Sequence, residues 1–194
     1  MYAMDPDRDG ALVWQTRIGH GSKLGGIQWG GAANAGIAFF AVSDVRVTPV
    51  LSGTAGARPS KFGVDLALDP STGGGLFALD EATGKVVWST PNRACVRPGC
   101  SPAQSAAVTA IPGIVFSGGL DGHVRAYAAA NGAIVWDADT ERDFVTVDGV
   151  AARGGSLDGP GPVVAGGMLY VESGYDFLGT APGNVLLAFS VRDR

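Results

Sequence analysis

Few side chains in this sequence have the types and the spacing that redox or metal chemistry requires. Cys95 and Cys100 flank the segment V-R-P-G, and a Pro-Gly turn can bring two α-carbons within reach of a disulfide. We therefore expect a Cys95–Cys100 bridge rather than two free thiols, and an oxidising compartment with it. The order C-V-R-P-G-C is not C-x-x-C-H, so no haem site is predicted. His20 and His123 lack further ligands at metal-binding spacing, so no zinc site is expected.

The composition favours an all-β protein and excludes several classes. Glycine makes up 31 of the 194 residues without a Gly-X-Y period, which excludes collagen, and valine outnumbers leucine 21 to 13, which favours strands. The net charge is −4 and the sequence contains no run of like charges, so no nucleic-acid partner is expected. The longest apolar stretches are far shorter than the ~20 residues of a spanning helix, so no membrane span is predicted.

Three tryptophans recur in one pattern, and a fixed pattern of this kind indicates repeated structural units. Each tryptophan follows a glycine by four residues, in the pairs Gly10/Trp14, Gly84/Trp88 and Gly132/Trp136. Upstream of such motifs, two short apolar runs are joined by a glycine turn at Gly36, Gly113 and Gly167. The motif that opens with Ala188 is incomplete within the sequence.

One copy shows the expected strands most clearly. Apolar runs at residues 107–111, 114–117, 123–127 and 133–137 are separated by Pro-Gly, Asp-Gly and Asn-Gly turns. Four antiparallel strands in 48 residues are typical of a β-propeller blade. We therefore predict an all-β, partial β-propeller of about three to four four-stranded blades, with repeat units at about residues 1–26, 27–103, 104–157 and 158–194.

The longer connections are all expected on one face of this propeller. Two lie between the second and third strands of a blade and three follow the repeated tryptophans, at residues 43–74, 175–183, 15–26, 89–103 and 137–157. In a propeller these two kinds of loop emerge on the same side, whereas the short turns emerge on the other. Because binding residues concentrate on elaborated loops, this side is the predicted functional face.

The tryptophans divide into two groups. Trp14, Trp88 and Trp136 are expected in the outermost strands, where each packs against the glycine turn of a neighbouring blade. Trp29 instead lies near the start of an innermost strand, so we expect it to point toward the central funnel.

The motif A-x-D-x-x-T-G-x-x-x-W, present from Ala78 to Trp88, resembles the tryptophan-docking repeat of pyrroloquinoline-quinone dehydrogenases and related propellers. The segments GSKLGGIQWG, CSPAQSAAVTAIPGIVFSGGLDGHVRAY and GGSLDGPGPVVAGGMLYVESGY are similar to the polyvinyl-alcohol-dehydrogenase-like branch, and the likeness covers nearly the whole chain. The docking repeat also occurs in outer-membrane assembly lipoproteins that bind proteins and carry no quinone.

This resemblance implies a periplasmic or secreted enzyme that oxidises hydroxyl groups of an alcohol or polymer substrate. It implies pyrroloquinoline quinone and calcium as cofactors and a cytochrome c as the electron acceptor. The implied site has Trp29 stacking on the quinone, with Gln28, Gln104 and Ser105 as polar partners. Asp158 is the implied calcium ligand or catalytic base. A simple loop-capping role for Ser105 and Asp158 stays open at this stage.

Lys23 lies in the same loop as Trp29 and is a candidate to neutralise a quinone carboxylate. The family's quinone stacks on a disulfide of adjacent cysteines, whereas four residues separate the two cysteines of this chain. This difference leaves open which group lies opposite Trp29.

An eight-bladed quinoprotein requires about 350 to 400 residues at the usual ~40–50 per blade, so this chain is expected to be a C-terminal part whose partners include the missing N-terminal blades. Its first ten residues, MYAMDPDRDG, lack the pattern of a signal peptide. On its own, the chain is expected to be inactive. The alternative is a non-catalytic propeller that presents its elaborated face to a protein or polymer.

Overall fold

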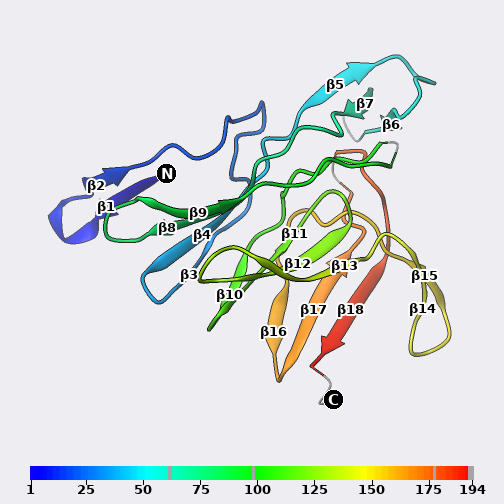
Figure 1. Cartoon of the computed structure of the whole chain (residues 1–194). Helices are drawn as coiled ribbons and strands as arrows, with labels where there is room; N and C mark the ends of the chain where they lie inside the picture. Colours follow the sequence, from blue (N-terminus) through cyan, green and yellow to red (C-terminus); the bar gives the residue numbers. More distant parts are fainter. Residues whose placement is uncertain (61–62, 98, 177, 192–194) are drawn as a thin grey trace.

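Antiparallel sheets of two to four strands make up almost all of the regular structure, as the valine-rich composition predicts (Figure 1). The computed structural model describes residues 1–60, 63–97, 99–176 and 178–191. Within this part of the chain, no helix has the length and apolar character needed to cross a membrane.

Two sheets have the four strands of a complete blade, each in sequence order. The first joins β3 (Ala32–Asn34), β4 (Ile37–Val42), β8 (Gly75–Asp80) and β9 (Val86–Thr90). The second joins β10 (Thr109–Ile111), β11 (Ile114–Gly118), β12 (His123–Ala128) and β13 (Ile134–Asp139). The predicted strands of this second blade are therefore confirmed to within a few residues at their ends, and so is the fold class. The boundaries of the repeat units remain a prediction.

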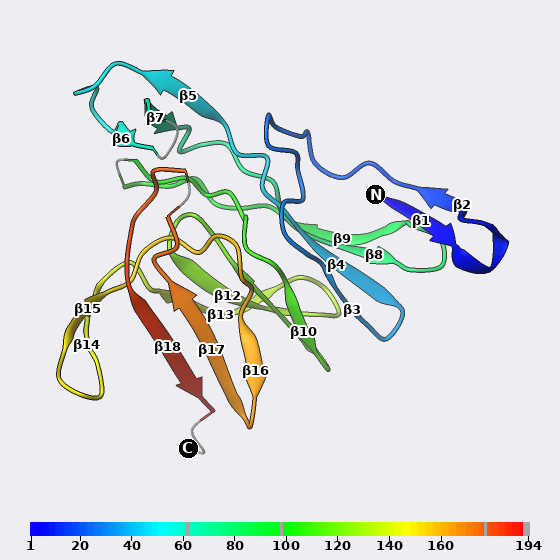
Figure 2. The ribbon, with the colours of Figure 1, turned by 180° about the vertical axis from the view of Figure 1, so that it is seen from behind.

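Partial blades flank these two sheets. Near the N-terminus, β1 (Tyr2–Asp5) and β2 (Ala11–Gln15) form a hairpin whose connection contains a 3-10 turn, η1 (Pro6–Arg8). Toward the C-terminus, β16 (Val163–Ala165), β17 (Met168–Ser173) and β18 (Val185–Ser190) form a three-stranded sheet. Figure 2 shows from behind that the two complete blades lie between these partial ones.

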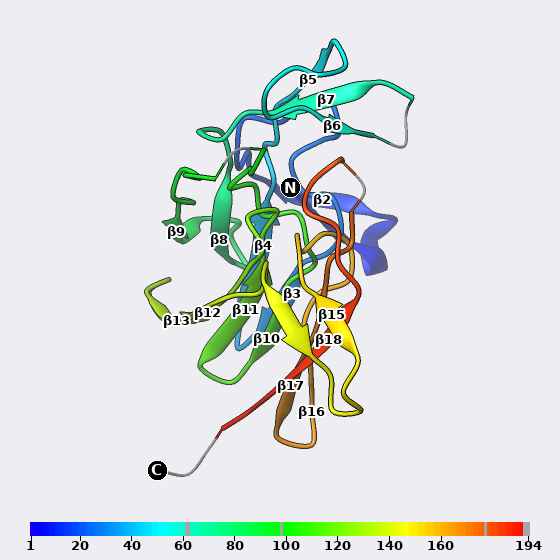
Figure 3. The same ribbon diagram turned by 90° about the vertical axis from the view of Figure 1, so that its right-hand side faces the viewer.

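Two of the long connections carry small sheets of their own. Residues 43–74 contain β5 (Val47–Val50), β6 (Arg58–Pro59) and β7 (Asp65–Leu68), with β7 in the middle. Residues 137–157 contain the hairpin of β14 (Asp143–Val145) and β15 (Ala151–Arg153). The β5–β7–β6 sheet lies at the opposite end of the molecule from the β16–β17 turn (Figures 1 and 3).

Side chains from neighbouring blades form the apolar core. Phe39 and Leu76 of one blade pack in a buried cluster with Val115 and Tyr127 of the next. A second cluster joins Val124 to the third blade through residues that include Leu157, Leu169 and Val171. Burial of these side chains between sheets, rather than within one sheet, holds the blades together.

The tryptophans of the repeated motif add a specific joint between blades. The Trp14 indole N–H donates to the Glu81 carbonyl at 2.8 Å, and the Trp88 indole N–H donates to the Ala129 carbonyl at 2.9 Å. A Cβ placed on Gly84 would lie 2.5 Å from the Trp14 ring, and one on Gly132 would lie 2.5 Å from the Trp88 ring. Each tryptophan ring thus packs closely against the glycine turn of the following blade.

A threonine two residues after each of these tryptophans completes the joint. Thr16 donates to the Gly84 carbonyl at 2.6 Å and Thr90 donates to the Gly132 carbonyl at 2.7 Å. Trp136 has a different neighbour, the Phe189 ring at 5.1 Å in a T-shaped arrangement. We call the Trp14–Gly84 and Trp88–Gly132 contacts the docking joints.

Candidate functional site

The inner ends of three blades meet at one point, and backbone hydrogen bonds hold them there. The Val108 N–H donates to the Gly30 carbonyl at 2.9 Å, and the Ala107 N–H donates to the Gly159 carbonyl at 3.0 Å. The segment before β10 therefore lies between the segments that precede β3 and β16. A Cβ on Gly161 would lie 2.5 Å from the Ala107 carbonyl oxygen, which explains why glycine is needed at this approach.

Four of the predicted site residues come together here, which we call the inner cluster: Gln28, Trp29, Ser105 and Asp158. The Trp29 indole N–H donates to Asp158 Oδ1 at 3.0 Å, although 129 residues separate them in sequence. The Ser105 hydroxyl donates to the same oxygen at 2.6 Å. Ser105 Oγ also makes a very short contact with Gln28 Oε1.

Burial differs sharply within the inner cluster. Asp158 is 3% exposed and Ser105 is 2% exposed, whereas Trp29 is 53% exposed. The carboxylate is thus withdrawn from solvent while the indole ring remains open to it. Such a pairing offers a flat aromatic surface whose polar edge is already bonded, which suits stacking of a planar ligand.

Gln104 has a different environment from its neighbour Ser105. Its side chain is fully buried, and its Nε2 donates to Ser117 Oγ at 3.1 Å and to the Tyr127 hydroxyl at 2.8 Å. Gln104 and Ser105 lie in the irregular segment before β10, and their side chains have different partners. The structure therefore places Gln104 inside its own blade rather than beside Trp29.

Burial of the Tyr127 phenol raises its pKa to about 12, from an ordinary value of 10.0. The folded chain thus keeps the phenol neutral. The neutral Tyr127 phenol contributes fully to the free energy of unfolding below about pH 10, and this contribution is lost as pH rises from 10 toward 12. We expect the free energy of unfolding to fall by up to about 3 kcal/mol across this window.

Chemical denaturation at pH 9 and at pH 12 measures this effect, and Tyr127→Phe should show a correspondingly shallower loss because phenylalanine does not ionise. Equal losses in both proteins would contradict the assignment.

Lys23 is exposed, and no hydrogen bond or ion pair of its side chain is seen within the described residues. Its role at a quinone carboxylate remains a prediction. The backbone N–H groups of His20 and Gly21, in the same loop, donate to the buried Asp44 carboxylate at 2.7 and 2.8 Å.

Asp44, Asp121 and Tyr175 lie near these loops and were not predicted as site residues from the sequence. Asp44 and Asp121 each follow a turn glycine by eight residues (Gly36 and Gly113), and both are buried, so the repeat register could have identified them. Tyr175 lies beside Gly159, where an added Cβ would be 3.5 Å from the Tyr175 ring and 3.7 Å from the Trp29 ring.

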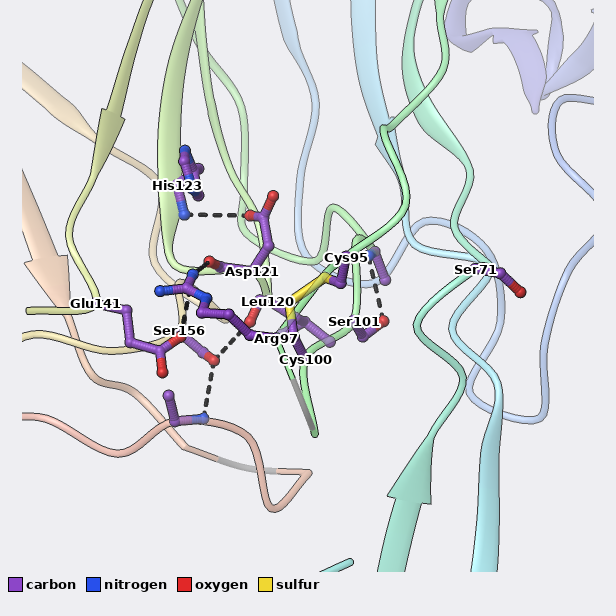
Figure 4. Close-up of a disulfide and its surroundings, with 12 residues drawn as sticks. Ser71, Cys95, Arg97, Cys100, Ser101, Leu120, Asp121, His123, Glu141 and Ser156 are labelled. Atoms are coloured by element: carbon purple, nitrogen blue, oxygen red, sulfur yellow. Dashed lines mark hydrogen bonds and ion pairs between the residues drawn. A yellow bond between two sulfur atoms is a disulfide. The ribbon is translucent and has the colours of Figure 1, made fainter. Parts of the chain in front are cut away.

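The predicted disulfide is present between Cys95 and Cys100, whose α-carbons are 5.8 Å apart (Figure 4). Pro98 of the expected turn lies outside the described residues. Arg97, inside the bridged loop, reaches the next blade, where its guanidinium donates to the Asp121 carbonyl and pairs with Glu141 at 3.3 Å. The bridge therefore constrains a loop that links two blades.

Removing the bridge with the double change Cys95→Ser and Cys100→Ser is expected to lower the free energy of unfolding by about 2 kcal/mol, the loop-closure contribution of so short a ring. Denaturation with and without a thiol reductant measures it. The reductant should shift the unmodified chain to the midpoint of the double variant and leave the variant itself unchanged. A reductant effect of equal size on both proteins would contradict this account.

Blades joined in sequence order, tryptophan docking joints and inner strands that converge on an aromatic residue define a β-propeller of the quinoprotein type. Residues 72–194 match the PQQ_2 family, described as "Outer membrane protein assembly factor BamB". Because the match covers more than half of the chain, the chain belongs to this family, and the resemblance predicted from its motifs is confirmed.

Two curated relatives match almost the whole chain. Both are polyvinylalcohol dehydrogenases, from Pseudomonas sp and Sphingopyxis sp. (strain 113P3), and each is 40% identical over 98% of this chain. The alignment covers 29% of each relative, so the chain spans less than a third of their length.

Among solved structures, a europium-containing methanol dehydrogenase superposes on 89% of this chain and 34% of its own, with a TM-score of 0.55 and 16% identity. At this identity the likeness supports the propeller fold.

Proposed function

We propose that this chain is part of a quinone-dependent oxidoreductase that oxidises hydroxyl groups of an alcohol or polyol, with polyvinyl alcohol as the first candidate substrate. The observation that carries the proposal is the inner cluster, in which a half-exposed Trp29 is bonded to a buried Asp158 where three blades meet. The 40% identity to two polyvinylalcohol dehydrogenases supports this chemistry.

The residues of the inner cluster fit a planar quinone. The exposed face of Trp29 is available for stacking, and one buried polar atom of the Gln28 amide has no hydrogen-bond partner within the described residues. When bound, the quinone supplies a two-electron acceptor, so that an alcohol loses two electrons and two protons to become a carbonyl compound.

In this proposal Asp158 Oδ2 coordinates calcium or accepts the proton of the substrate hydroxyl, because Oδ1 already accepts two hydrogen bonds. A buried carboxylate beside a quinone that carries carboxylates is unfavourable without an intervening cation. The described ranges hold no cluster of three or more His, Cys, Asp or Glu side chains suited to a metal. The remaining ligands of a calcium ion would therefore be carbonyl or amide oxygens, or would come from other blades.

Electron transfer to a cytochrome c and a periplasmic or secreted location belong to the same proposal. The disulfide supports an oxidising compartment. The described part of the chain contains about two complete and two partial blades, so we propose that activity requires the further blades of a longer protein.

The family description and the lack of a metal-binding cluster among the described side chains favour one alternative, a propeller that binds a protein or polymer without catalysis. Dye reduction by the whole protein, supplied with pyrroloquinoline quinone and calcium, separates the two. Reduction that depends on both polyvinyl alcohol and quinone supports the enzyme. Quinone-independent binding of the polymer without dye reduction supports the alternative, and activity of the 194-residue chain alone would contradict the need for further blades.

A further inference from the structure

The Trp29 ring has less packing to hold it than the tryptophans of the docking joints. Trp14 and Trp88 pack closely against glycine turns and donate to backbone carbonyls of the next blade. Trp29 is 53% exposed, and its indole N–H donates to a side-chain carboxylate instead. Its orientation therefore depends on that carboxylate more than on a surrounding core.

Asp158 is well placed to fix the ring. The residue is 3% exposed, and the carbonyl of the next residue, Gly159, accepts a hydrogen bond from Ala107 at 3.0 Å. Ser105, itself buried, donates to Asp158 Oδ1 at 2.6 Å. Asp158 is thus held, at its carboxylate and at the adjacent backbone, by two groups of the segment before β10.

The number of protons on the Ser105 hydroxyl decides which atom of the Gln28 amide faces it. The Ser105 hydroxyl has one proton, which it cannot donate to Gln28 Oε1 and to Asp158 Oδ1 together. With Oε1 toward Ser105, the Gln28 Nε2 is buried without a partner. Exchanging the amide oxygen and nitrogen removes the conflict, because Nε2 then donates to Ser105 Oγ.

We infer that Asp158 is a positioning residue for Trp29 and that Gln28, Ser105 and Asp158 form one directed chain of hydrogen bonds. Gln28 donates to Ser105, Ser105 donates to Asp158, and Trp29 donates to the same carboxylate oxygen. This chain sets the plane of the exposed indole before any ligand arrives. Its use in orienting a stacked quinone rests on the proposed function, whereas the hydrogen bonds themselves do not.

Nuclear magnetic resonance of the folded protein labelled with ¹⁵N-tryptophan tests the inference without quinone. Each of the four tryptophans of the chain gives one indole N–H signal, and Trp29→Phe identifies the signal of Trp29. In Asp158→Ala, solvent exchange of the Trp29 indole proton is expected to be on the order of tenfold faster, because the charge-assisted bond is lost. Unchanged signals of Trp14 and Trp88 show that the variant is folded.

Two further variants separate positioning from charge. Asp158→Asn keeps an acceptor oxygen at the same place. The solvent exchange rate of the Trp29 indole proton should therefore stay within about twofold of its rate in the unmodified protein. Ser105→Ala frees the carboxylate to move and should accelerate exchange without touching Trp29, and it serves alone if Asp158→Ala does not fold. Exchange that is unchanged in Ser105→Ala, or equally fast in Asp158→Asn and Asp158→Ala, would overturn the inference.

The proposed function is tested by a different measurement, the binding of quinone. Failure to bind quinone would refute the function and leave the indole result intact. A slow-exchanging indole in every variant would refute the positioning role and leave the quinone site to its own test.

Discussion

Replacing Trp29 with alanine is expected to weaken binding of pyrroloquinoline quinone about tenfold to hundredfold. Stacking of a planar ring on an aromatic side chain contributes about 1–3 kcal/mol in comparable protein complexes. The Trp29 ring is half exposed and its N–H is already bonded to Asp158, so its face is available to the ligand without breaking that bond. Equilibrium titration of the whole protein with quinone, in the presence of calcium, gives the dissociation constants to compare.

Two controls accompany this titration. Trp29→Phe keeps an aromatic face but loses the indole N–H, so it should retain most of the affinity. Tyr2→Ala removes an aromatic side chain of similar exposure (60%) from β1, away from the inner cluster, and should have no effect. A dissociation constant that is the same for Trp29→Ala and for Tyr2→Ala would contradict a stacking role of Trp29.

Changing Gly132 to alanine is expected to lower the free energy of unfolding by about 2–5 kcal/mol. Gly132 has a φ of +72°, and a Cβ at this position would lie 2.5 Å from both the Trp88 ring and Thr90 Oγ1. The added methyl group therefore combines the ~1–2 kcal/mol of a left-handed backbone with the ~1–3 kcal/mol of overpacking in a closed contact. It should also displace Trp88 from its docking joint.

Gly113→Ala is the matched control, because Gly113 has a φ of +83° but no atom within 4 Å of an added Cβ. This control measures the backbone cost alone. The difference between the two variants in chemical denaturation should be about 1–3 kcal/mol. Equal destabilisation would mean that the docking joint tolerates the methyl group and holds the blades less tightly than its geometry indicates.

The docking joints could be predicted from the sequence because each joins the tryptophan of one repeated motif to the glycine of the next motif. The glycine, the tryptophan and the strand between them occur within one motif, and its recurrence fixes the contact between adjacent blades. The same logic gave the four strands of the second blade, since Pro112-Gly113, Asp121-Gly122 and Asn131-Gly132 mark its turns.

The small sheet inside residues 43–74 was not predicted, and its composition explains why. Pro49 lies in β5 and Pro59 lies in β6, and proline usually argues against a strand. Both strands are edges of the β5–β7–β6 sheet, where a missing N–H is tolerated. Local sequence alone does not show which strand will be central.

The inner cluster was predictable as a set of positions but not as a set of bonds. Register placed the segments of Trp29, Ser105 and Asp158 at the inner ends of successive blades. The hydrogen bond between Trp29 and Asp158 depends on the relative orientation of the blades. No local sequence pattern specifies that orientation. Ser105 faces the cluster and Gln104 faces Tyr127 because of the path of the irregular segment before β10, which the sequence pattern does not specify.

The most direct test of the account is an experimental structure of the whole protein with pyrroloquinoline quinone and calcium bound. We expect the quinone ring to lie parallel to the Trp29 indole, over the point where the three inner strands meet, with the Trp29 N–H still bonded to Asp158. A quinone bound elsewhere on the propeller, with the Trp29 face open to solvent, would contradict the assignment of the inner cluster as the cofactor site.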